Sequence, residues 1–415
     1  MSDHIAPASP MPAGSPRPPR SALARAAGSV ALAGLGIVMA LGLAEVALRL
    51  AGITYPVFET PDATRGVALR PGKEGWYRKE GEALVRINAH GYRDSERQLA
   101  KPAGTFRIAV LGDSFVESRQ VALEASFPVV MEKALAGCPA LGGHAVEVLN
   151  FGVSGYATTE ALLTLRQDAL RFAPDLVLLA LYPGNDIGEN SKKVVQGAGA
   201  ADWRMPKPIH TLDARGELVL EGGVQPTLLR RALYVGIHHS RLLEIVNEVR
   251  RIWEVRKLRQ AASQAQDTFE LGISKEVYAP PADDAWREAW QVTEGLLARV
   301  QREATAGQAR FAVGVVTMAE QVHPQAAQRA AVQQRLGVPD LLYAERRIGE
   351  IGAKTGFAVV RLAEPLRAAA ERDQVFLHGF KNTVMGFGHW NEAGHRVAGQ
   401  TLARELCAGG LGARP

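Results

Sequence analysis

The segment I-A-V-L-G-D-S-F, residues 108–115, decides the fold of this 415-residue chain. Its first four residues are all apolar, as expected for a short parallel strand that is covered on both faces. Gly112 and Asp113 then permit a tight turn, and Ser114 follows at the expected start of a helix. In α/β proteins, ligands bind beyond the carboxyl ends of such strands. We therefore expect Ser114 to lie at a binding edge.

Two further segments repeat this pattern of an apolar run followed by a polar turn. They are N-F-G-V-S-G-Y around Gly155 and L-Y-P-G-N-D around Asn185. A fourth segment, G-H-W-N-E-A-G-H, carries His389 just before an expected helix with Asn391 at its N-cap. Together they supply a nucleophile, potential oxyanion donors and a base, which are the groups needed for acyl transfer at an ester.

Strands and helices alternate along most of the chain. The expected strands are Ile108–Leu111, Val146–Leu149, Leu176–Leu181, Phe311–Val316 and Phe357–Leu362. Helical patterns between them include Phe127–Leu135, Glu160–Phe172 and Trp286–Ala304. This alternation predicts an α/β fold, a three-layer αβα sandwich with a central parallel sheet.

The four segments, in this order, resemble the SGNH hydrolases, also called GDSL-type serine esterases. The resemblance covers roughly residues 85–405 and implies the flavodoxin-like SGNH hydrolase fold. It implies that Ser114 is the nucleophile and His389 the general base. The backbone N–H groups of Ser114 and Gly155 and the side-chain amide of Asn185 would form the oxyanion hole.

Each of these residues also has an ordinary structural explanation. Ser114 could be a helix N-cap, Gly155 a turn glycine and Asn185 the first residue of an Asx turn. The four segments together favour the catalytic interpretation. His395, inside the last helix, is expected to have a packing or hydrogen-bonding role, and His389 is preferred as the base.

The sequence departs from the family pattern at the acidic residue. The family usually has Asp three, sometimes two, residues before the base, and those positions are Gly386 and Phe387 here. We therefore expect a Ser–His dyad, supported by a backbone carbonyl. Otherwise Glu371, Asp373 or another carboxylate must reach His389 from elsewhere.

An uncharged, apolar stretch lies near the N-terminus, over residues 26–44. Its length suits a transmembrane helix, with a buried core helix or a long signal peptide as alternatives. Arg17, Arg20 and Arg25 precede it, which places the N-terminus in the cytoplasm and the catalytic domain in the periplasm or its equivalent. The expected protein is thus a single-pass protein of the inner membrane.

The expected organisation has four parts. They are a disordered cytoplasmic tail at 1–25, a transmembrane anchor at 26–48, a linker and approach segment at 49–104, and an SGNH hydrolase-like domain at 105–410 with an insertion at 187–283. In the approach segment, Asn88, Gly91 and Asp94 suit turns rather than catalysis.

The insertion contains a helical pattern in which apolar residues repeat over 242–253 and the opposite face is basic. We expect this helix to dock on the core with its charged face in solvent; the alternative is an anionic membrane surface. The insertion could also cap the active site. The two cysteines, Cys138 and Cys407, should each end a helix on the same sheet face, so either a disulfide or two separate buried thiols is possible.

Composition excludes several classes of protein. The net charge is only +5, and no nucleic-acid-binding motif is present. No His/Cys/Asp cluster has metal-ligand spacing and no phosphate-binding loop follows a strand, so we expect no metal, no cofactor and no nucleic acid as partner. The expected function is a membrane-anchored esterase that removes acyl, chiefly O-acetyl, groups from a carbohydrate or another small ester. The alternatives are an O-acyltransferase acting on an exported glycan and a non-catalytic glycan-binding protein.

Overall fold

The computed structural model describes residues 22–197, 207–222, 227–264 and 274–409, and the chain forms two compact units, Met1–Ile53 and Thr54–Pro415. Most of the expected N-terminal tail, including Arg17 and Arg20, lies outside the described residues. The first unit contains helix α1, Ala22–Leu50. Among the described residues, the stretch Arg25–Leu50 is the one helix long and apolar enough to cross a membrane, with a mean hydropathy of 2.1.

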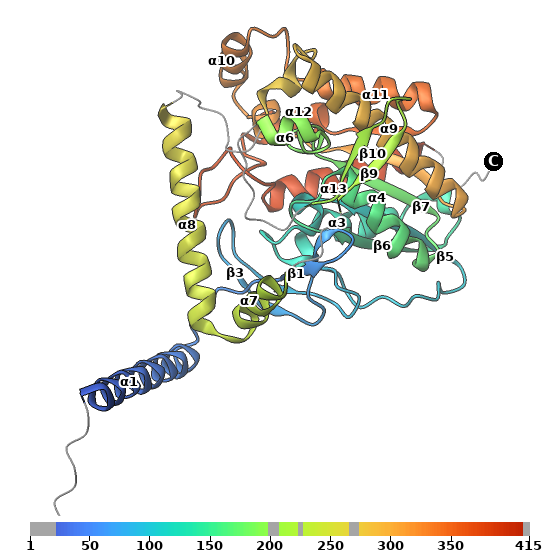
Figure 1. The fold of residues 1–415 in the computed structure, drawn as a ribbon. Helices are drawn as coiled ribbons and strands as arrows, with labels where there is room; N and C mark the ends of the chain where they lie inside the picture. The colour runs from blue at the N-terminus through green and yellow to red at the C-terminus, as the bar shows by residue number, and fades with distance from the viewer. Residues whose placement is uncertain (1–21, 198–206, 223–226, 265–273, 410–415) are drawn as a thin grey trace, which may run out of the picture. The chain divides into compact units, whose positions relative to one another are not determined.

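The second unit is built around a five-stranded parallel sheet (Figure 1). Its strands in chain order are β5 (Thr105–Gly112), β6 (Ala145–Gly152), β7 (Leu176–Leu181), β10 (Arg310–Val315) and β11 (Ala358–Arg361). Their spatial order is β11-β10-β7-β5-β6, the order of flavodoxin-like sheets. All five strands overlap the predicted apolar runs. The inner strands β5, β7 and β10 do so because a strand buried on both faces is largely a continuous apolar segment.

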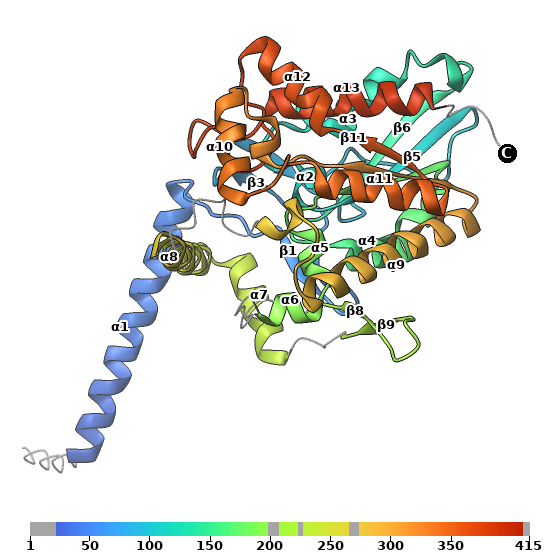
Figure 2. The ribbon, with the colours of Figure 1, turned by 90° about the horizontal axis from the view of Figure 1, so that it is seen from above.

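Helices cover both faces of this sheet (Figure 2). One layer holds α3 (Phe127–Leu135), α12 (Ala363–Asp373) and α13 (Glu392–Ala408), and the other holds α4 (Thr158–Gln167), α9 (Asp284–Ala306) and α11 (Tyr343–Thr355). A short helix, α10 (Ala326–Leu336), follows β10. The predicted three-layer αβα class is confirmed.

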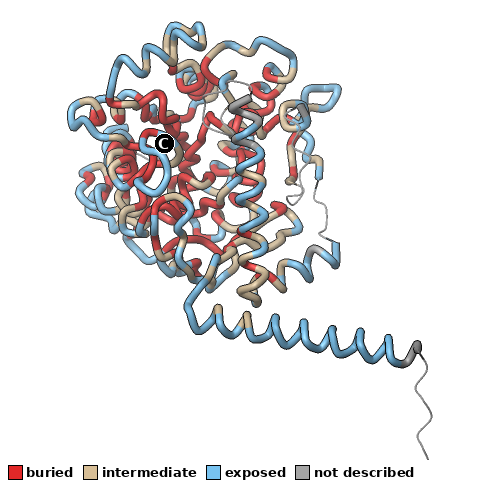
Figure 3. Tube along the Cα trace, turned by 90° about the vertical axis from the view of Figure 1, so that its left-hand side faces the viewer, coloured by how far each residue is buried: buried red, intermediate tan, exposed pale blue. Residues whose placement is uncertain are grey.

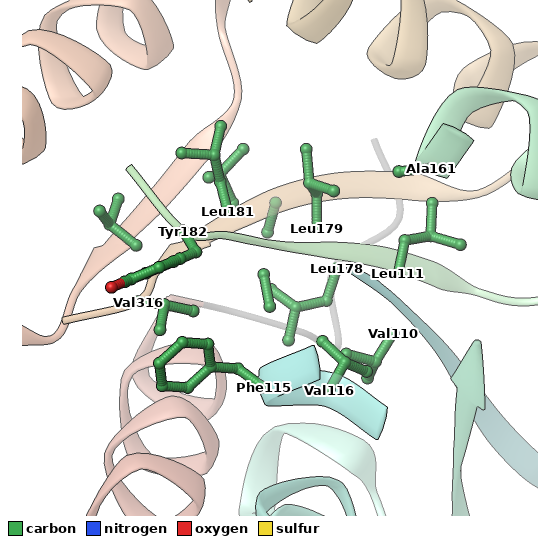
Figure 4. Packing of buried hydrophobic residues seen from close by; sticks show 14 of the residues in the cluster. Val110, Leu111, Phe115, Val116, Ala161, Leu178, Leu179, Leu181, Tyr182 and Val316 are labelled. Atoms are coloured by element: carbon green, nitrogen blue, oxygen red, sulfur yellow. The ribbon is translucent and has the colours of Figure 1, made fainter. Parts of the chain in front are cut away.

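The core lies between the sheet and these layers. Val110 and Leu178 from the central strands are fully buried, and Phe115 lies beside Tyr182 with ring centroids 4.6 Å apart (Figure 4). Close packing of this kind leaves little freedom for the turns that follow the strands. The edge of the sheet that carries Ser114 is therefore a rigid platform.

The approach segment forms two antiparallel hairpins. Their strands are β1 (Glu59–Asp62), β2 (Gly66–Leu69), β3 (Glu74–Tyr77) and β4 (Ala83–Arg86). Beyond them, the Oδ1 atom of Asn88 accepts hydrogen bonds from the backbone N–H groups of His90 and Tyr92, each 3.0 Å long, which is the turn chemistry expected of Asn88. Arg93 is buried and donates to the carbonyls of Glu117, Ser118 and Val121, so the segment is attached to the residues that follow Ser114.

The insertion contains several small elements and two longer helices. They are α5 (Asp186–Glu189), α6 (Lys192–Gly197), β8 (Ile209–Leu212), β9 (Leu218–Glu221), α7 (Leu228–His239) and α8 (Arg241–Gln264). Helix α8 was predicted, but the orientation expected for it was wrong. Its buried residues include Glu244 and Glu248, whereas the apolar Val246, Val249 and Trp253 are exposed. Figure 3 shows how buried and exposed residues are distributed along the chain.

Cys138 and Cys407 form a disulfide. Cys138 follows α3 and Cys407 lies in the last turn of α13, and these two helices pack against each other. Of the two possibilities that the sequence left open, the structure has the cross-link. The two cysteines are 269 positions apart, and the loop that they close contains β6, β7, β10 and β11 of the parallel sheet.

Removing this cross-link should lower the stability of the body. A Cys407→Ser variant is expected to lose about 2–4 kcal/mol of unfolding free energy, because the unfolded chain is no longer constrained over so long a loop. Chemical denaturation followed by circular dichroism measures the loss. A reducing agent should destabilise the wild type by a similar amount and leave the Cys138→Ser/Cys407→Ser double variant unchanged. Equal stability of wild type and variant would contradict the prediction.

Candidate active site

Ser114 lies directly beyond the carboxyl end of the central strand β5, at the start of the short helix α2 (Ser114–Glu117). Gly112 makes the turn possible, because a Cβ there would lie 2.5 Å from Val116 Cγ2 and 2.8 Å from the carbonyl oxygen of Ala180. The helix cap is Asp113, whose Oδ1 accepts a 2.9 Å hydrogen bond from the N–H of Phe115. Since Asp113 caps the helix, the hydroxyl of Ser114 is not used for capping.

The Ser114 hydroxyl instead contacts His389. Ser114 Oγ and His389 Nε2 are 2.7 Å apart, although the two residues are 275 positions apart in the chain. His389 comes from the loop before α13, and its ring lies 4.9 Å from the ring of Phe115. A serine within hydrogen-bonding distance of an imidazole nitrogen is the arrangement needed to activate a nucleophile.

A third residue completes this arrangement, and it is Glu80. Its Oε2 lies 2.5 Å from His389 Nδ1, and its Oε1 accepts a 2.8 Å hydrogen bond from the backbone N–H of His389. The structure therefore has the second alternative that the sequence left open, a carboxylate that reaches His389 from elsewhere, and not a Ser–His dyad supported by a carbonyl. Glu371 and Asp373, considered from the sequence, are ion-paired with Arg329 and Arg372.

The two contacts of His389 fix the roles of its ring nitrogens. A carboxylate can only accept, so Nδ1 carries the proton that it donates to Glu80, and Nε2 is left to accept from Ser114. Burial alone would raise the pKa of Glu80, but the hydrogen bonds from His389, the positive charge that His389 carries when it is protonated, and a hydrogen bond from Gln120 lower it below its usual value. Glu80 is thus held as a carboxylate.

The loop that carries Glu80 connects β3 and β4 and is held from several sides. Gly81 adopts φ +66°, and a Cβ there would lie 2.2 Å from the carbonyl oxygen of Gln120. Asn382 accepts from the N–H of Gly81 and donates to its carbonyl, both at 2.9 Å. Lys79, the residue before Glu80, forms a 2.9 Å ion pair with Glu248 on α8. These contacts set the position of the carboxylate.

Little in the sequence points to Glu80. It lies 309 residues before His389, in a segment interpreted as a linker and approach. The only local signals are a charged turn, R-K-E-G-E at 78–82, and a glycine directly after the glutamate. Neither distinguishes an orienting carboxylate from an exposed hairpin loop.

The His389 loop is fixed from inside the body. His378 is buried; its Nδ1 lies 2.6 Å from the carbonyl oxygen of Gly388 and its Nε2 lies 2.9 Å from Thr317 Oγ1. Burial lowers the pKa of His378 to about 4, so it stays neutral and donates to that carbonyl from Nδ1. Trp390 donates to the same Thr317 hydroxyl at 2.8 Å. The residues on both sides of His389 are therefore held.

Two neighbours of His389 behave as the sequence predicts. Asn391 caps α13 by accepting from the N–H groups of Ala393 and Gly394 at 3.0 and 3.1 Å. His395 is buried against Phe127, and its Nδ1 accepts a 3.3 Å hydrogen bond from the Phe127 N–H. Burial lowers the pKa of His395 to about 3, which fits a neutral packing residue.

Gly155 follows β6, which pairs with β5 on one side. It adopts φ +80°, a conformation that favours glycine. The preceding residue, Ser154, is held by the buried carboxylate of Glu117, which accepts from both its N–H and its Oγ at 2.6 Å. Glu117 is itself ion-paired with Arg119. This arrangement fixes the turn that presents the Gly155 N–H.

Asn185 follows β7, which pairs with β5 on the other side. Ser114 thus lies at the central of three adjacent strands, with Gly155 and Asn185 beyond the same edge of the sheet. The Asn185 Oδ1 is buried and has no partner among the described residues. A rotation of the side-chain amide by 180° exchanges its oxygen and nitrogen. Asn185 can therefore place its NH₂ group where the Oδ1 atom now lies.

Two buried acids lie behind these turns. Burial raises the pKa of Asp113 to about 6, and burial together with the nearby Asp113 raises that of Asp186 well above its usual value. The higher pKa of Asp186 favours its neutral form, so the two acids place less negative charge near Ser114 than two carboxylates would. Within the described ranges, no group of three or more His, Cys, Asp or Glu residues could hold a metal ion.

The chain matches no protein-family model and no curated protein sequence. Among solved structures, it is similar to a G-D-S-L family protein from Desulfitobacterium hafniense DCB-2, with 11% identity over 72% of this chain and 98% of that one, and a TM-score of 0.33. It is also similar to Axe2, an acetylxylan esterase from Geobacillus stearothermophilus, with 12% identity, 72% and 94% coverage and a TM-score of 0.36. A third is TesA, with 13% identity, 72% and 97% coverage and a TM-score of 0.35.

The contact between Glu80 and His389 predicts a specific kinetic effect. Glu80→Gln should lower kcat for an ester substrate by roughly 10³–10⁴ with little change in KM, because the amide no longer holds the imidazole in the required tautomer. Steady-state kinetics with a chromogenic ester measures the effect. Thermal unfolding of the same sample shows whether the fold is retained.

Glu82 offers a matched control on the same hairpin loop. Its carboxylate is exposed and pairs with Arg78, so Glu82→Gln removes a charge without touching His389. We expect kcat of this variant to remain within about twofold of wild type, since exposed ion pairs contribute little. If kcat fell equally in both variants, the effect of Glu80 would come from the negative charge of the hairpin loop and not from its contact with His389.

Proposed function

We propose that this chain is a serine esterase in which Ser114 is the nucleophile, His389 the general base and Glu80 the residue that orients His389. The observation that carries the proposal is the continuous set of contacts from Ser114 Oγ through His389 to Glu80, at 2.7 and 2.5 Å. A helix-capping serine and a structural histidine would have no need of this set. The proposed substrate is an acyl ester, chiefly an O-acetyl group on a carbohydrate, as the SGNH resemblance implies.

In the first half-reaction, Ser114 Oγ attacks the carbonyl carbon of the ester while His389 Nε2 takes the hydroxyl proton. The carbonyl oxygen becomes an oxyanion, which the N–H groups of Ser114 and Gly155 and the amide of Asn185 would stabilise. His389 then gives its proton to the departing alkoxide. The C–O bond to the alcohol breaks, and the acyl group stays on Ser114.

In the second half-reaction, His389 removes a proton from a water molecule, which attacks the acyl carbon. The bond to Ser114 Oγ breaks, the serine recovers its proton from His389, and a carboxylic acid leaves. Glu80 remains a carboxylate throughout and stabilises the imidazolium formed in each step. Its low pKa is consistent with this role.

The presence of Glu80 bears on the alternative functions. A non-catalytic glycan-binding protein was considered because the usual acid is missing before His389, and Glu80 removes that reason. The O-acyltransferase alternative uses the same acyl-Ser114 and replaces water by a sugar hydroxyl. It differs from hydrolysis only in the acceptor, so product analysis distinguishes the two.

The proposed location is the outer surface of the inner membrane, with α1 as a single span and the body in the periplasm. The length and apolar composition of Arg25–Leu50 support the span. The Cys138–Cys407 disulfide supports an oxidising compartment, because disulfides are rare in the reducing cytosol.

The nucleophile is tested with a fluorophosphonate probe on the full chain in detergent micelles, followed by peptide mass spectrometry. The expected adduct is on Ser114 alone, and it should be absent in His389→Ala, because the hydroxyl is not activated without its base. Labelling of another serine in the wild type, or unchanged labelling in His389→Ala, would refute the assignment.

The oxyanion hole is tested at Asn185. Asn185→Ala should lower kcat for an acetyl ester by about 10²–10³ and leave the melting temperature nearly unchanged, since one transition-state donor is lost. Adding acetylated glycan with and without a sugar acceptor then separates the reactions, because acetate release without acceptor indicates hydrolysis. Near wild-type kcat in Asn185→Ala would remove this residue from the site.

A further inference from the structure

Helix α8 has an apolar side and a charged side, and the charged side is the one that is buried. Glu244 and Glu248 are only 2% and 6% exposed, whereas Val246, Val249 and Trp253 are 62%, 48% and 64% exposed. Residues two apart on a helix point in nearly opposite directions, and residues three, four or seven apart share a side. The exposed three therefore form one stripe, opposite the two glutamates.

The buried side is held by polar contacts. Glu244 accepts from Thr54 Oγ1 and from the N–H of Tyr55, each at 3.0 Å, and pairs with Arg241. Glu248 pairs with Lys79. Helix α8 is thus attached to the body through charge, and its apolar stripe faces away from these partners. A stripe of this kind on a soluble surface is costly unless another apolar phase covers it.

The charges beside the stripe indicate what covers it. By helical spacing, Arg256 flanks one side of the stripe, and Arg250 and Lys257 flank the other. Arg256 and Lys257 are exposed, while the acidic Glu244 and Glu248 are turned inward. An apolar stripe with an indole and with cationic residues on both sides is the pattern of a helix that lies in the interface of an anionic bilayer.

Chain connectivity places a bilayer within reach. Helix α1 ends at Leu50, and Thr54, four residues on, bonds to Glu244 in the first turn of α8. Four residues span at most about 14 Å, so a bilayer that held the apolar segment would lie within reach of the first turn of α8. A partner protein would have to reach the stripe beside the membrane to which the chain is tethered.

We infer that α8 is an interfacial helix, which lays Val246, Val249 and Trp253 into the surface of an anionic phospholipid bilayer while Arg250, Arg256 and Lys257 contact the headgroups. The body is then held at the membrane at two places, by the apolar segment Arg25–Leu50 and by α8. This inference rests on the membrane span proposed above but not on the esterase proposal, and it uses no residue of the Ser114 site.

The test uses the full chain in lipid vesicles and a nitroxide label. Both native cysteines are in the disulfide, so a single added cysteine is labelled selectively. The probe position is Val249→Cys, and the control is Gln334→Cys, which is exposed on α10. Electron paramagnetic resonance compares the accessibility of each label to oxygen, which concentrates in lipid, and to a water-soluble nickel chelate.

In vesicles of phosphatidylglycerol and phosphatidylcholine, the Val249→Cys label should be several-fold more accessible to oxygen and less accessible to nickel than the Gln334→Cys label. Adding Arg256→Glu and Lys257→Glu should weaken the contact by roughly fivefold or more for each charge, and phosphatidylcholine alone should also weaken it. Thermal unfolding confirms that the variants are folded, since all of these side chains are exposed.

Several results would overturn the inference. Equal accessibility at the two positions would show that the stripe faces water. Spin–spin broadening at Val249→Cys that persists in detergent would assign the stripe to a second copy of this chain. If the protection of the Val249→Cys label from the nickel chelate did not depend on phosphatidylglycerol or on the charge-reversing substitutions, an anionic lipid surface would be excluded. Failure of the chain to float with vesicles would exclude both membrane attachments.

Discussion

The hydrogen bond between Glu80 and His389 is the interaction on which the whole site depends. It joins a hairpin loop outside the sheet to the loop before α13, across 309 residues of sequence. A partly buried carboxylate is costly unless it is hydrogen-bonded, so the hydrogen bonds from His389 stabilise Glu80 in the position that the hairpin loop gives it. In turn, His389 presents Nε2 to Ser114 only while Glu80 holds the proton on Nδ1. The same contact therefore stabilises the partly buried carboxylate and selects the tautomer of the imidazole.

The parts of the site that follow strands could be predicted from the sequence because their signals are local. An apolar run followed by a small polar turn identifies both a buried parallel strand and the residue beyond its carboxyl end. Ser114, Gly155 and Asn185 each follow such a run, and the order β7-β5-β6 brings the three turns to one edge. The Asn391 cap similarly placed His389 at the start of the last helix. The predicted strand bounds differ from those in the structure by a few residues at most, since hydrogen bonding extends a strand beyond its apolar centre.

The role of Glu80 and the orientation of α8 could not be predicted, because both are decided by polar contacts between residues that lie far apart in the sequence. Spacing before the base led to Gly386 and Phe387, and nothing local shows that a hairpin loop 309 residues earlier supplies the carboxylate. For α8, periodicity predicted the helix but not the side that docks. The usual expectation is that the apolar side faces the core. Here Lys79 and the Thr54 segment provide partners for Glu248 and Glu244, and these paired carboxylates decide the orientation.

The same contacts show that the site needs residues from outside the αβα body. Lys79 and Glu80 are consecutive, yet Lys79 pairs with Glu248 on α8 and Glu80 bonds to His389. The acid therefore comes from a loop that the insertion holds from one side and the His389 loop holds from the other. A fragment beginning at residue 105 would retain the sheet, Ser114 and His389 but would lack the carboxylate and the partner of α8. The residues from Thr54 onward form one compact unit, and the contacts of Glu80 give a chemical reason why the site requires all of it.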